Sequence, residues 1–358
     1  MRNVWMVVAF AVVSASVVRA ETHRFTPTQY YNSFSAFHPP SLRVAPGDRV
    51  VTRTVDAAGV DASGATVAAR PNPLTGPFYV VGAEPGDTLV VRIERLETNR
   101  STGYSSSLMA PFAVTPNDLI ARTDREPRVI TWAIDKARGL VSYGGAELGT
   151  GPIALPIVPM LGCVGVAPGR KEAIASSTPG AFGGNMDYAG VVAGVTVMLP
   201  VSEPGALLFI GDGHARQGAG EVVGTGVETS MDVEFSVDVL KKPSAWPRLE
   251  NETHIMVLGS ARPLLEALQI ATGELGRWLV SDYGLSERGA SILLGQSLEY
   301  DVANVVDPSF TVVAKIRKGS IPGVRSMAVL PFAAKVERQD LTPIKARPDP
   351  QLTSPPAA

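Results

Sequence analysis

Short apolar runs broken by Pro-Gly turns constrain the fold of this chain more than any other feature. The stretches APGDRVVTRTV and EPGDTLVVRIE each place a tight turn before alternating apolar residues, so we expect two β-hairpins of related design. The run SMDVEFSVDVL also alternates, which predicts a sheet with one solvent-exposed face. The 358 residues include 35 Gly and 29 Pro, and the expected fold class is mainly β, with sandwich or barrel elements.

The character of the sequence changes in its last third. Apolar residues recur at helical spacing in ARPLLEALQIATGELGRWLVSDYG, and Gly284 is a suitable stop. LSERGASILLGQSLEY predicts a second helix with Ser286 as its N-cap, and DPSFTVVAKIRKG predicts a closing strand. We therefore expect a β-rich region over 21–250, a smaller α+β C-terminal part of the same unit over 251–320, and a tail over 321–358.

The first twenty residues differ from the rest of the chain. MRNVWMVVAFAVVSASVVRA has an early Arg, an apolar stretch and a small-residue end before Glu21, which is typical of a secretory signal peptide. The alternative is a membrane anchor, but the apolar stretch is short for a span and ends in Arg19. We expect residues 1–20 to be cleaved, which leaves an exported protein without a stable membrane anchor.

Cysteine content and net charge indicate the cellular compartment and the class of partner. Cys163 is the only cysteine, so no intrachain disulfide can form, and an exported protein of this kind suits a bacterial periplasm or secretion from a bacterium. Its apolar neighbours predict a buried, inert thiol rather than a nucleophile. The net charge of −2 gives no reason to expect a nucleic-acid partner.

One histidine lies in a glycine-rich stretch, GDGHARQGAGEVVGTGVET, directly after the apolar run ALLFI. Glycines at this density allow tight turns and close approach of the backbone to a ligand. Asp212, His214 and Glu221 could supply metal ligands or an acid/base pair at the end of a buried strand. The alternative is a glycine-rich hairpin whose histidine bonds a backbone carbonyl.

Five further residues are candidates for a site. His38 precedes two prolines that stiffen its segment, although it could also be a histidine of a surface turn. Asp56 ends a strand and is a candidate metal ligand. Glu84 lies between a strand and a tight turn, where a partly buried carboxylate can act as general base. In GGNMD, Asn185 and Asp187 would share one face of an extended strand, unless the segment is a loop rich in Asx turns.

Five stretches occur together and in order: APGDRVVTRTVDAAG, NPLTGPFYVVGAEPGDTL, LGCVGVAPG, TPGAFGGNMD and GDGHARQGAGEVVGTGVET. They closely resemble the acetamidase/formamidase family of amide hydrolases, over residues 30 to 318, and the leader suggests an exported branch. The resemblance implies a β-rich fold with a smaller α/β part and release of ammonia from short aliphatic amides. Some relatives act on other amides, including a lactam, with metal dependence.

The resemblance is carried by individual positions. The matching residues are His214 and Glu221 in GDGH and GxGE, Asn185 and Asp187 in GGNMD, Glu84 in GAEPGD, and Asp56 at a strand end. One position departs, because the family usually has an acidic residue where this chain has Ala219. If that acid binds a ligand or orients His214, activity could be reduced or shifted. If it faces solvent, nothing changes.

The resemblance and the residues together suggest a metal-dependent amidase with a small amide substrate. The metal expected is zinc, and the expected ligands are His214, His38 and Asp56 or Asp187. We expect Glu84 or Glu221 to move a proton between water and the leaving ammonia. We expect the substrate to be bound by Asn185 and by backbone N–H groups at Gly184 and Gly213, which would stabilise the oxyanion.

Other functions stay open on the sequence alone. The chain could be a non-catalytic periplasmic β protein that binds a small ligand, which Ala219 favours, or a hydrolase of a lactam or another amide. A homo-oligomer is possible, because the apolar helix around Trp278 could form an interface. Packing of that helix in the core explains its pattern equally well.

Overall fold

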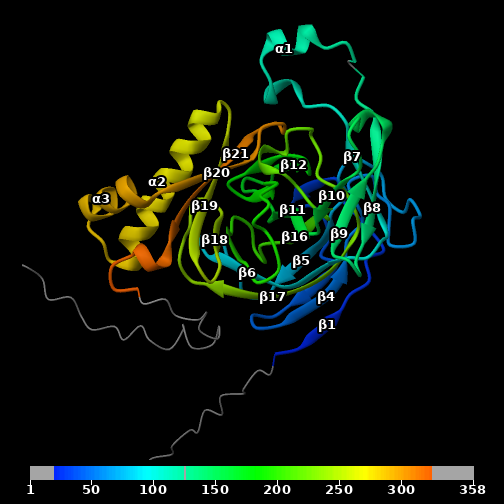
Figure 1. Cartoon of the computed structure of the whole chain (residues 1–358). Helices are drawn as coiled ribbons and strands as arrows, with labels where there is room; N and C mark the ends of the chain where they lie inside the picture. The colour runs from blue at the N-terminus through cyan, green and yellow to red at the C-terminus, as the bar shows by residue number, and fades with distance from the viewer. Residues whose placement is uncertain (1–19, 125, 325–358) are drawn as a thin grey trace, which may run out of the picture.

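The computed structural model describes residues 20–124 and 126–324, which form facing β-sheets with a pair of helices at one side (Figure 1). The mainly β fold class is confirmed, and the two longest helices lie near the C-terminal end of the described chain. The predicted signal peptide and the predicted tail fall outside the described residues, except for residue 20 and residues 321–324.

A nine-stranded sheet forms one layer. In spatial order its strands are β1 (Thr22–Arg24), β4 (Arg49–Arg53), β17 (Met231–Leu240), β6 (Thr88–Thr98), β15 (Thr196–Pro200), β18 (Arg248–Glu250), β19 (His254–Ala261), β21 (Phe310–Arg317) and β20 (Glu299–Asn304). β17 alternates buried and half-buried residues along most of its length, which confirms the predicted one-sided strand. β21 is the predicted closing strand.

A six-stranded sheet faces it, with the order β13 (Pro179–Gly180), β14 (Gly183–Asn185), β11 (Met160–Gly165), β16 (Leu208–His214), β5 (Thr75–Val80) and β3 (Leu42–Val44). A smaller sheet has the order β10 (Ile153–Pro156), β9 (Leu140–Tyr143), β8 (Val129–Asp135) and β7 (Thr102–Ser106). β2 (Ser33–Ser35) pairs with β12 (Ala173–Ala175).

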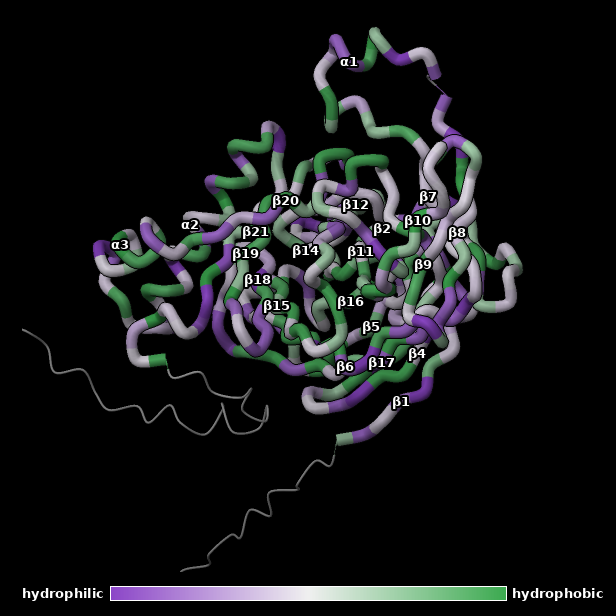
Figure 2. Tube along the Cα trace, in the orientation of Figure 1, coloured by the Kyte–Doolittle hydropathy of each residue, from purple (hydrophilic) through white to green (hydrophobic). Residues whose placement is uncertain are grey.

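The main core fills the space between the two large sheets, and a second core lies under the helices. In β15, Val197 and Leu199 belong to the main core, whereas Met198 belongs to the helical side. The nine-stranded sheet is therefore apolar on both faces in this region, as expected for a sheet covered on both sides. Figure 2 shows hydrophobic positions gathered in the interior strands, around β11, β16 and β5.

The two predicted β-hairpins are not formed, and that prediction was wrong. β3, before the first turn, pairs with β5 in the six-stranded sheet, whereas β4, after the turn, pairs with β17 in the nine-stranded sheet. β5 and β6 are divided between the sheets in the same way. Each turn crosses from one layer of the sandwich to the other, because the apolar faces of its two strands meet across the core.

The predicted helical pair is confirmed as α2 (Leu264–Tyr283) and α3 (Glu287–Ser297). Gly284 ends α2 with φ of 70°, and the Ser286 hydroxyl accepts the Gly289 N–H at 3.0 Å to begin α3. The other helical segments are α1 (Pro116–Ala121) and the 3-10 turns η1 (Pro111–Ala113), η2 (Ala146–Leu148), η3 (Ala219–Glu221) and η4 (Lys318–Ser320). Among the described residues, no helix has the length and apolar character needed to cross a membrane.

A buried ion pair fixes α2 to the nine-stranded sheet. Glu274 on α2 is 1% exposed and accepts hydrogen bonds from Nε and Nη2 of Arg248 on β18, at 3.0 and 2.6 Å. The Arg248 guanidinium also lies 5.0 Å from the centre of the buried Trp278 ring. The Trp278 side of α2 therefore belongs to the core of this chain, and homo-oligomerisation stays a prediction.

Replacing Glu274 with Ala leaves the Arg248 guanidinium buried without its carboxylate partner. We expect the free energy of unfolding to fall by about 3–5 kcal/mol, as when one member of a buried ion pair is removed. Urea denaturation followed by tryptophan fluorescence measures the loss. Glu266→Ala removes an exposed carboxylate from the same helix and should change stability by less than about 0.5 kcal/mol. Equal losses in the two variants would contradict the role assigned to the ion pair.

Candidate active site

Five buried side chains converge at one end of β16, and we call them the His214 cluster. β16 supplies Asp212 and His214, Asp187 follows β14, Glu221 ends η3, and Glu228 lies in the segment before β17. Two sets of three ligand atoms each lie within 4.8 Å of one another, one in Asp187, His214 and Glu221, the other in Asp212, His214 and Glu228. The structure thus brings together His214, Asp187 and Glu221 from the sequence-predicted site.

Strand pairing creates the cluster. His214 lies opposite Glu228 in an antiparallel bridge, so the two side chains share one face. His214 Nε2 is 2.9 Å from Glu228 Oε1 and 3.4 Å from Asp212 Oδ1. On β11, a Cβ at Gly162 would lie 2.3 Å from both Asp187 Oδ1 and Asp212 Oδ2. Glycine at position 162 therefore lets both carboxylates close over the strand.

Three residues of the cluster have left-handed backbone conformations. The φ angle is 45° at Asp187, 56° at Asp212 and 47° at Glu221. Such conformations cost on the order of 1–3 kcal/mol each in non-glycine residues, and they concentrate at functional sites. The fold therefore holds these carboxylates in place at a cost in stability.

Gln217 orients the His214 ring through its Nδ1 atom. Its amide Nε2 donates to two backbone carbonyls, of Asp187 at 2.6 Å and of Ala303 at 3.4 Å. Its Oε1 must then accept from His214 Nδ1, which lies 2.8 Å away. In a neutral ring with its proton on Nδ1, Nε2 would offer its lone pair to a metal, a common arrangement for metal-binding histidines.

Three completely buried atoms of the cluster have no hydrogen-bond partner: Asp187 Oδ1, His214 Nε2 and Glu228 Oε2. Buried polar atoms without partners are rare in folded proteins. All three can act as electron-pair donors to a cation, and His214 is shared by the two ligand sets to which Asp187 and Glu228 belong. Imidazole nitrogen and carboxylate oxygen are ligands of zinc and other divalent metals. The donor set therefore fits the divalent metal expected from the sequence.

Burial and mutual repulsion perturb the charges of the cluster. Burial raises the pKa of Glu228 to about 7, although His214 opposes the rise. Burial also raises the pKa values of Asp187 and Glu221 well above their usual range, and neighbouring carboxylates add to both shifts. Burial alone would lower the pKa of His214, but Glu228 and Asp212 raise it well above its usual value. A bound cation would favour the ionised carboxylates.

Asn185 supports Asp187 through a hydrogen bond, and all the donor and acceptor atoms of its side-chain amide are engaged with other protein atoms. Its Nδ2 donates to Asp187 Oδ2 at 2.5 Å and to Asp307 Oδ2 at 2.8 Å. Its Oδ1 accepts from Asn72 Nδ2 at 2.8 Å and from the Cys163 thiol at 2.6 Å. The structure therefore gives Asn185 a positioning role in place of the expected substrate contact. The buried Cys163 is part of this support, and burial raises the pKa of its thiol.

Glu84 lies away from the His214 cluster. It is exposed in the turn between β5 and β6, where its N–H donates to Asp87 Oδ2 at 2.8 Å. Phe78 near the end of β5 pairs with Leu208 at the start of β16, so this turn lies at the end of β16 opposite His214. The length of β16, roughly 20 Å, separates the two ends. The structure does not place Glu84 where a general base is needed.

His38 and Asp56 also lie outside the cluster. His38 Nε2 is hydrogen-bonded to the Ser33 hydroxyl at 2.8 Å, and its ring packs on Tyr31 with ring centres 4.0 Å apart. Asp56 is 1% exposed and forms an ion pair with Arg100 at 2.6 Å, while its other oxygen accepts two backbone N–H groups of its own turn. Both side chains are engaged in local structure, so the structure does not bring them to the metal ligands.

Close packing explains why Gly184 and Gly213, which were expected to bind the oxyanion, are glycines. A Cβ at Gly184 would lie 2.4 Å from the carbonyl oxygen of Thr178, and one at Gly213 would lie 2.3 Å from Met231 Cγ. Both residues need glycine for close approach of neighbouring segments. Donation from their N–H groups to a substrate stays a prediction.

Ala219 faces solvent at the start of η3, whereas Glu221, two residues later, is buried. An acidic side chain at position 219 would therefore point away from the cluster. The departure from the family pattern leaves the His214 cluster unchanged.

The sequence did not single out Glu228, Gln217 and Asp307. Glu228 belongs to the same glycine-rich stretch as His214, which was the only available signal. Its role follows from the bridge to His214, which no sequence pattern reveals. Asp307 lies between β20 and β21 and reaches the cluster through Asn185.

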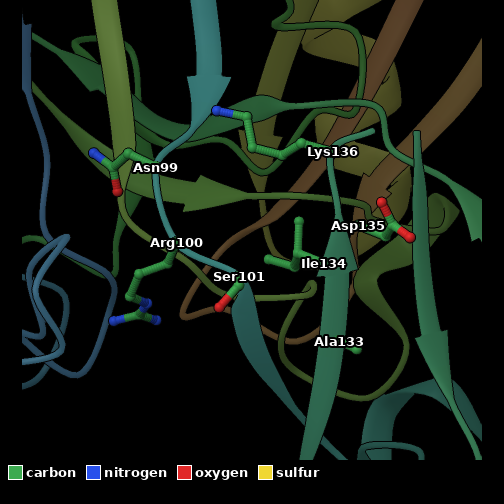
Figure 3. A pocket seen from close by; sticks show the side chains of 7 residues that line it. All are labelled: Asn99, Arg100, Ser101, Ala133, Ile134, Asp135 and Lys136. Carbon is green, nitrogen blue, oxygen red and sulfur yellow. The ribbon is translucent and has the colours of Figure 1, made fainter. Parts of the chain in front are cut away.

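A hollow of about 430 Å³ lies elsewhere, between the β6–β7 connection and the end of β8 (Figure 3). Its lining residues are Asn99, Arg100, Ser101, Ala133, Ile134, Asp135 and Lys136. The Arg100 guanidinium is engaged with Asp56, and no residue of the His214 cluster lines the hollow. The cluster is therefore the stronger candidate for chemistry.

Comparison with known proteins points to one family. A family model described as the acetamidase/formamidase family matches residues 170–274, a range that contains the whole His214 cluster. The structure of an acetamidase from Yersinia enterocolitica is 33% identical, with a TM-score of 0.73, and the match covers 85% of this chain and 94% of that chain. An acetamidase from Bacillus halodurans is 29% identical, with a TM-score of 0.73, and the match covers 84% of this chain and 99% of that chain.

A curated relative matches over a shorter region. A protein of Schizosaccharomyces pombe that is assigned as a formamidase is 29% identical over 212 residues, which are 47% of this chain and 52% of the relative. The matched part of this chain thus spans about half the length of that relative.

Gly162→Ala places a methyl group against Asp187 and Asp212 and should displace both carboxylates. We expect the purified variant, after incubation with zinc and dialysis, to retain much less metal than the wild type. Elemental analysis measures the metal bound per chain. Gly218→Ala is the matched control, because a Cβ there would have no atom within 4 Å, and it should retain metal like the wild type. Full metal content in Gly162→Ala would contradict the site.

Gln217→Leu removes the acceptor of the His214 Nδ1 proton and frees the ring to turn. Loss of such an outer partner weakens metal binding by about 10–100-fold. Competition with a chromophoric chelator measures the dissociation constant for zinc. Gln269→Leu, at an exposed position of α2, should leave it unchanged. Equal affinities in the two variants would show that Gln217 does not orient His214.

Proposed function

Because this chain belongs to the acetamidase/formamidase family, we propose that it is an amidase acting on C–N bonds other than peptide bonds. The proposed substrates are short aliphatic amides such as formamide or acetamide, from which ammonia is released. The observation that carries this proposal is the set of buried, unpartnered acceptor atoms in the His214 cluster. Burial of the cluster supports a small substrate rather than a polypeptide.

The metal proposed is a divalent ion held by His214 Nε2 with carboxylate oxygens of Asp212 and Glu228. Asp187, which forms the second ligand set with His214 and Glu221, is the remaining candidate ligand. The imidazole favours zinc, whereas an oxygen-rich set also suits manganese or magnesium. Bound there, the ion would polarise the amide carbonyl and lower the pKa of water.

Glu221 is the proposed general base. It is buried beside His214 and Asp187, and burial raises its pKa, with Asp307 and Glu228 adding to the shift. A positioned carboxylate can accept a proton from water and pass it on as a general base. Water adds to the carbonyl carbon, Glu221 takes its proton, and the proton passes to the amide nitrogen as the C–N bond breaks. The products are ammonia and the carboxylic acid.

Ammonia release tests the proposal. Purified wild type should release ammonia from formamide or acetamide, lose this activity after chelation, and regain it with one ion of a series containing zinc, manganese and magnesium. His214→Ala should lower kcat/KM by at least about 100-fold, since it removes the central ligand. Including 2-pyrrolidinone in the panel separates a lactamase from an amidase of linear amides.

Ala219→Asp is the matched control for the same assay. It restores the acidic residue usual in the family at an exposed position of the same loop, and it should leave the rate unchanged. No ammonia from any amide, with folded protein and each metal supplied, would overturn the proposed function. Unchanged hydrolysis by His214→Ala would remove the cluster from the mechanism.

A further inference from the structure

Tyr104 on β7 belongs to the same row of side chains as His214. It forms an antiparallel bridge with Glu228, and Glu228 forms the next bridge with His214. The backbones of Tyr104 and Glu228 exchange two hydrogen bonds, at 3.1 and 2.8 Å. Residues directly opposite each other in such pairs project from the same face, with Cβ atoms about 4.5–5.5 Å apart. The Tyr104 ring therefore stands beside Glu228, on the side of the sheet that carries the cluster.

The hydroxyl of Tyr104 has no hydrogen-bond partner among the described residues. Tyr188 and Tyr143 differ, because the Tyr188 hydroxyl donates to Asp301 at 2.9 Å and the Tyr143 hydroxyl bonds Glu147. Tyr104 is half-buried, whereas Glu228 beside it is almost completely buried. A half-buried hydroxyl without a partner, next to a buried cluster, is available to a molecule that approaches the cluster.

Tyr104 is held in its protonated form. Burial raises its pKa, and the carboxylates of Glu228, Asp56 and Asp212 raise it further. A tyrosine hydroxyl keeps its proton at neutral pH even without such a shift, and it can donate a hydrogen bond. With a cation bound, the carboxylates nearby would be ionised acceptors, so the cluster would otherwise offer few donors to a neutral substrate.

We propose that the Tyr104 hydroxyl donates a hydrogen bond to the carbonyl oxygen of the bound amide and to the oxyanion that forms from it. This inference rests on the proposed amidase function. The proton stays on Tyr104 throughout, so the residue makes and breaks no covalent bond. A fixed donor aimed at the developing negative charge stabilises the transition state more than the ground state.

Tyr104→Phe removes the donor and keeps the ring. We expect kcat for acetamide to fall by about 10²–10³-fold, the usual effect of losing one oxyanion donor. KM, metal content and the thermal midpoint should stay close to those of the wild type. Tyr143→Phe removes a hydroxyl from β9, a strand of the same sheet separated from β7 by β8, and should keep full activity. A Tyr104→Phe variant with the wild-type kcat would overturn the inference, as would a loss of kcat caused by lost metal.

A second measurement does not need turnover. In zinc-loaded protein labelled with ¹³C at tyrosine Cζ, the Tyr104 signal is the one missing from the Tyr104→Phe spectrum. Adding acetamide or acetate should shift this signal and leave that of Tyr143 in place. If the wild type hydrolyses no amide but the signal shifts, the proposed function fails and the Tyr104 contact stands. A Tyr104 signal that no carbonyl compound shifts overturns the contact, whether or not the protein is an amidase.

Discussion

The contact between the His214 imidazole and the carboxylates buried around it is the interaction on which this structure depends. Burying several carboxylates together is costly, because each loses water and repels the others. The perturbed pKa values of Asp187, Glu221 and Glu228 express that cost. A fold keeps such a group only when the surrounding structure over-determines it, and here backbone conformation, glycine placement and hydrogen bonds all act on the same few atoms.

The sandwich supplies this support from three directions. The six-stranded sheet carries Asp212 and His214 on β16 and leaves room for the carboxylates at Gly162 on β11. The segment of Glu228 bridges β16 to β7 and so joins the six-stranded sheet to the smaller one. The nine-stranded sheet contributes the turn after β20, where the Val305 N–H donates to the Gly220 carbonyl at 3.0 Å. The site therefore lies where three sheets meet, and no single element could form it alone.

The sequence predicts best what depends on local pattern. One-sided alternation predicted β17, helical spacing with a left-handed Gly284 and a Ser286 cap predicted α2 and α3, and glycine density pointed to His214. Pairing between distant segments was not predictable in this way. A Pro-Gly turn looks the same whether its strands pair with each other or enter different sheets.

The candidate site also shows the difference between local sequence pattern and contacts of distant segments. Glu84 and Asp56 occupy strand ends and tight turns that are typical of functional residues, and only the tertiary structure shows that turn formation and an ion pair use them. Glu228 carries no distinguishing sequence signal, because its role comes from its bridge to His214. Resemblance to the family supplied the activity, whereas the geometry selected which acids act together.

A crystal structure of the zinc-soaked protein, with an anomalous difference map collected at the zinc edge, tests the central claim most directly. We predict one strong peak in contact with His214 Nε2 and with carboxylate oxygens of Asp212 and Glu228. A map without a peak there, with His214 Nε2 protonated and hydrogen-bonded to Glu228 Oε1, would contradict the claim and make the cluster a buried ion pair.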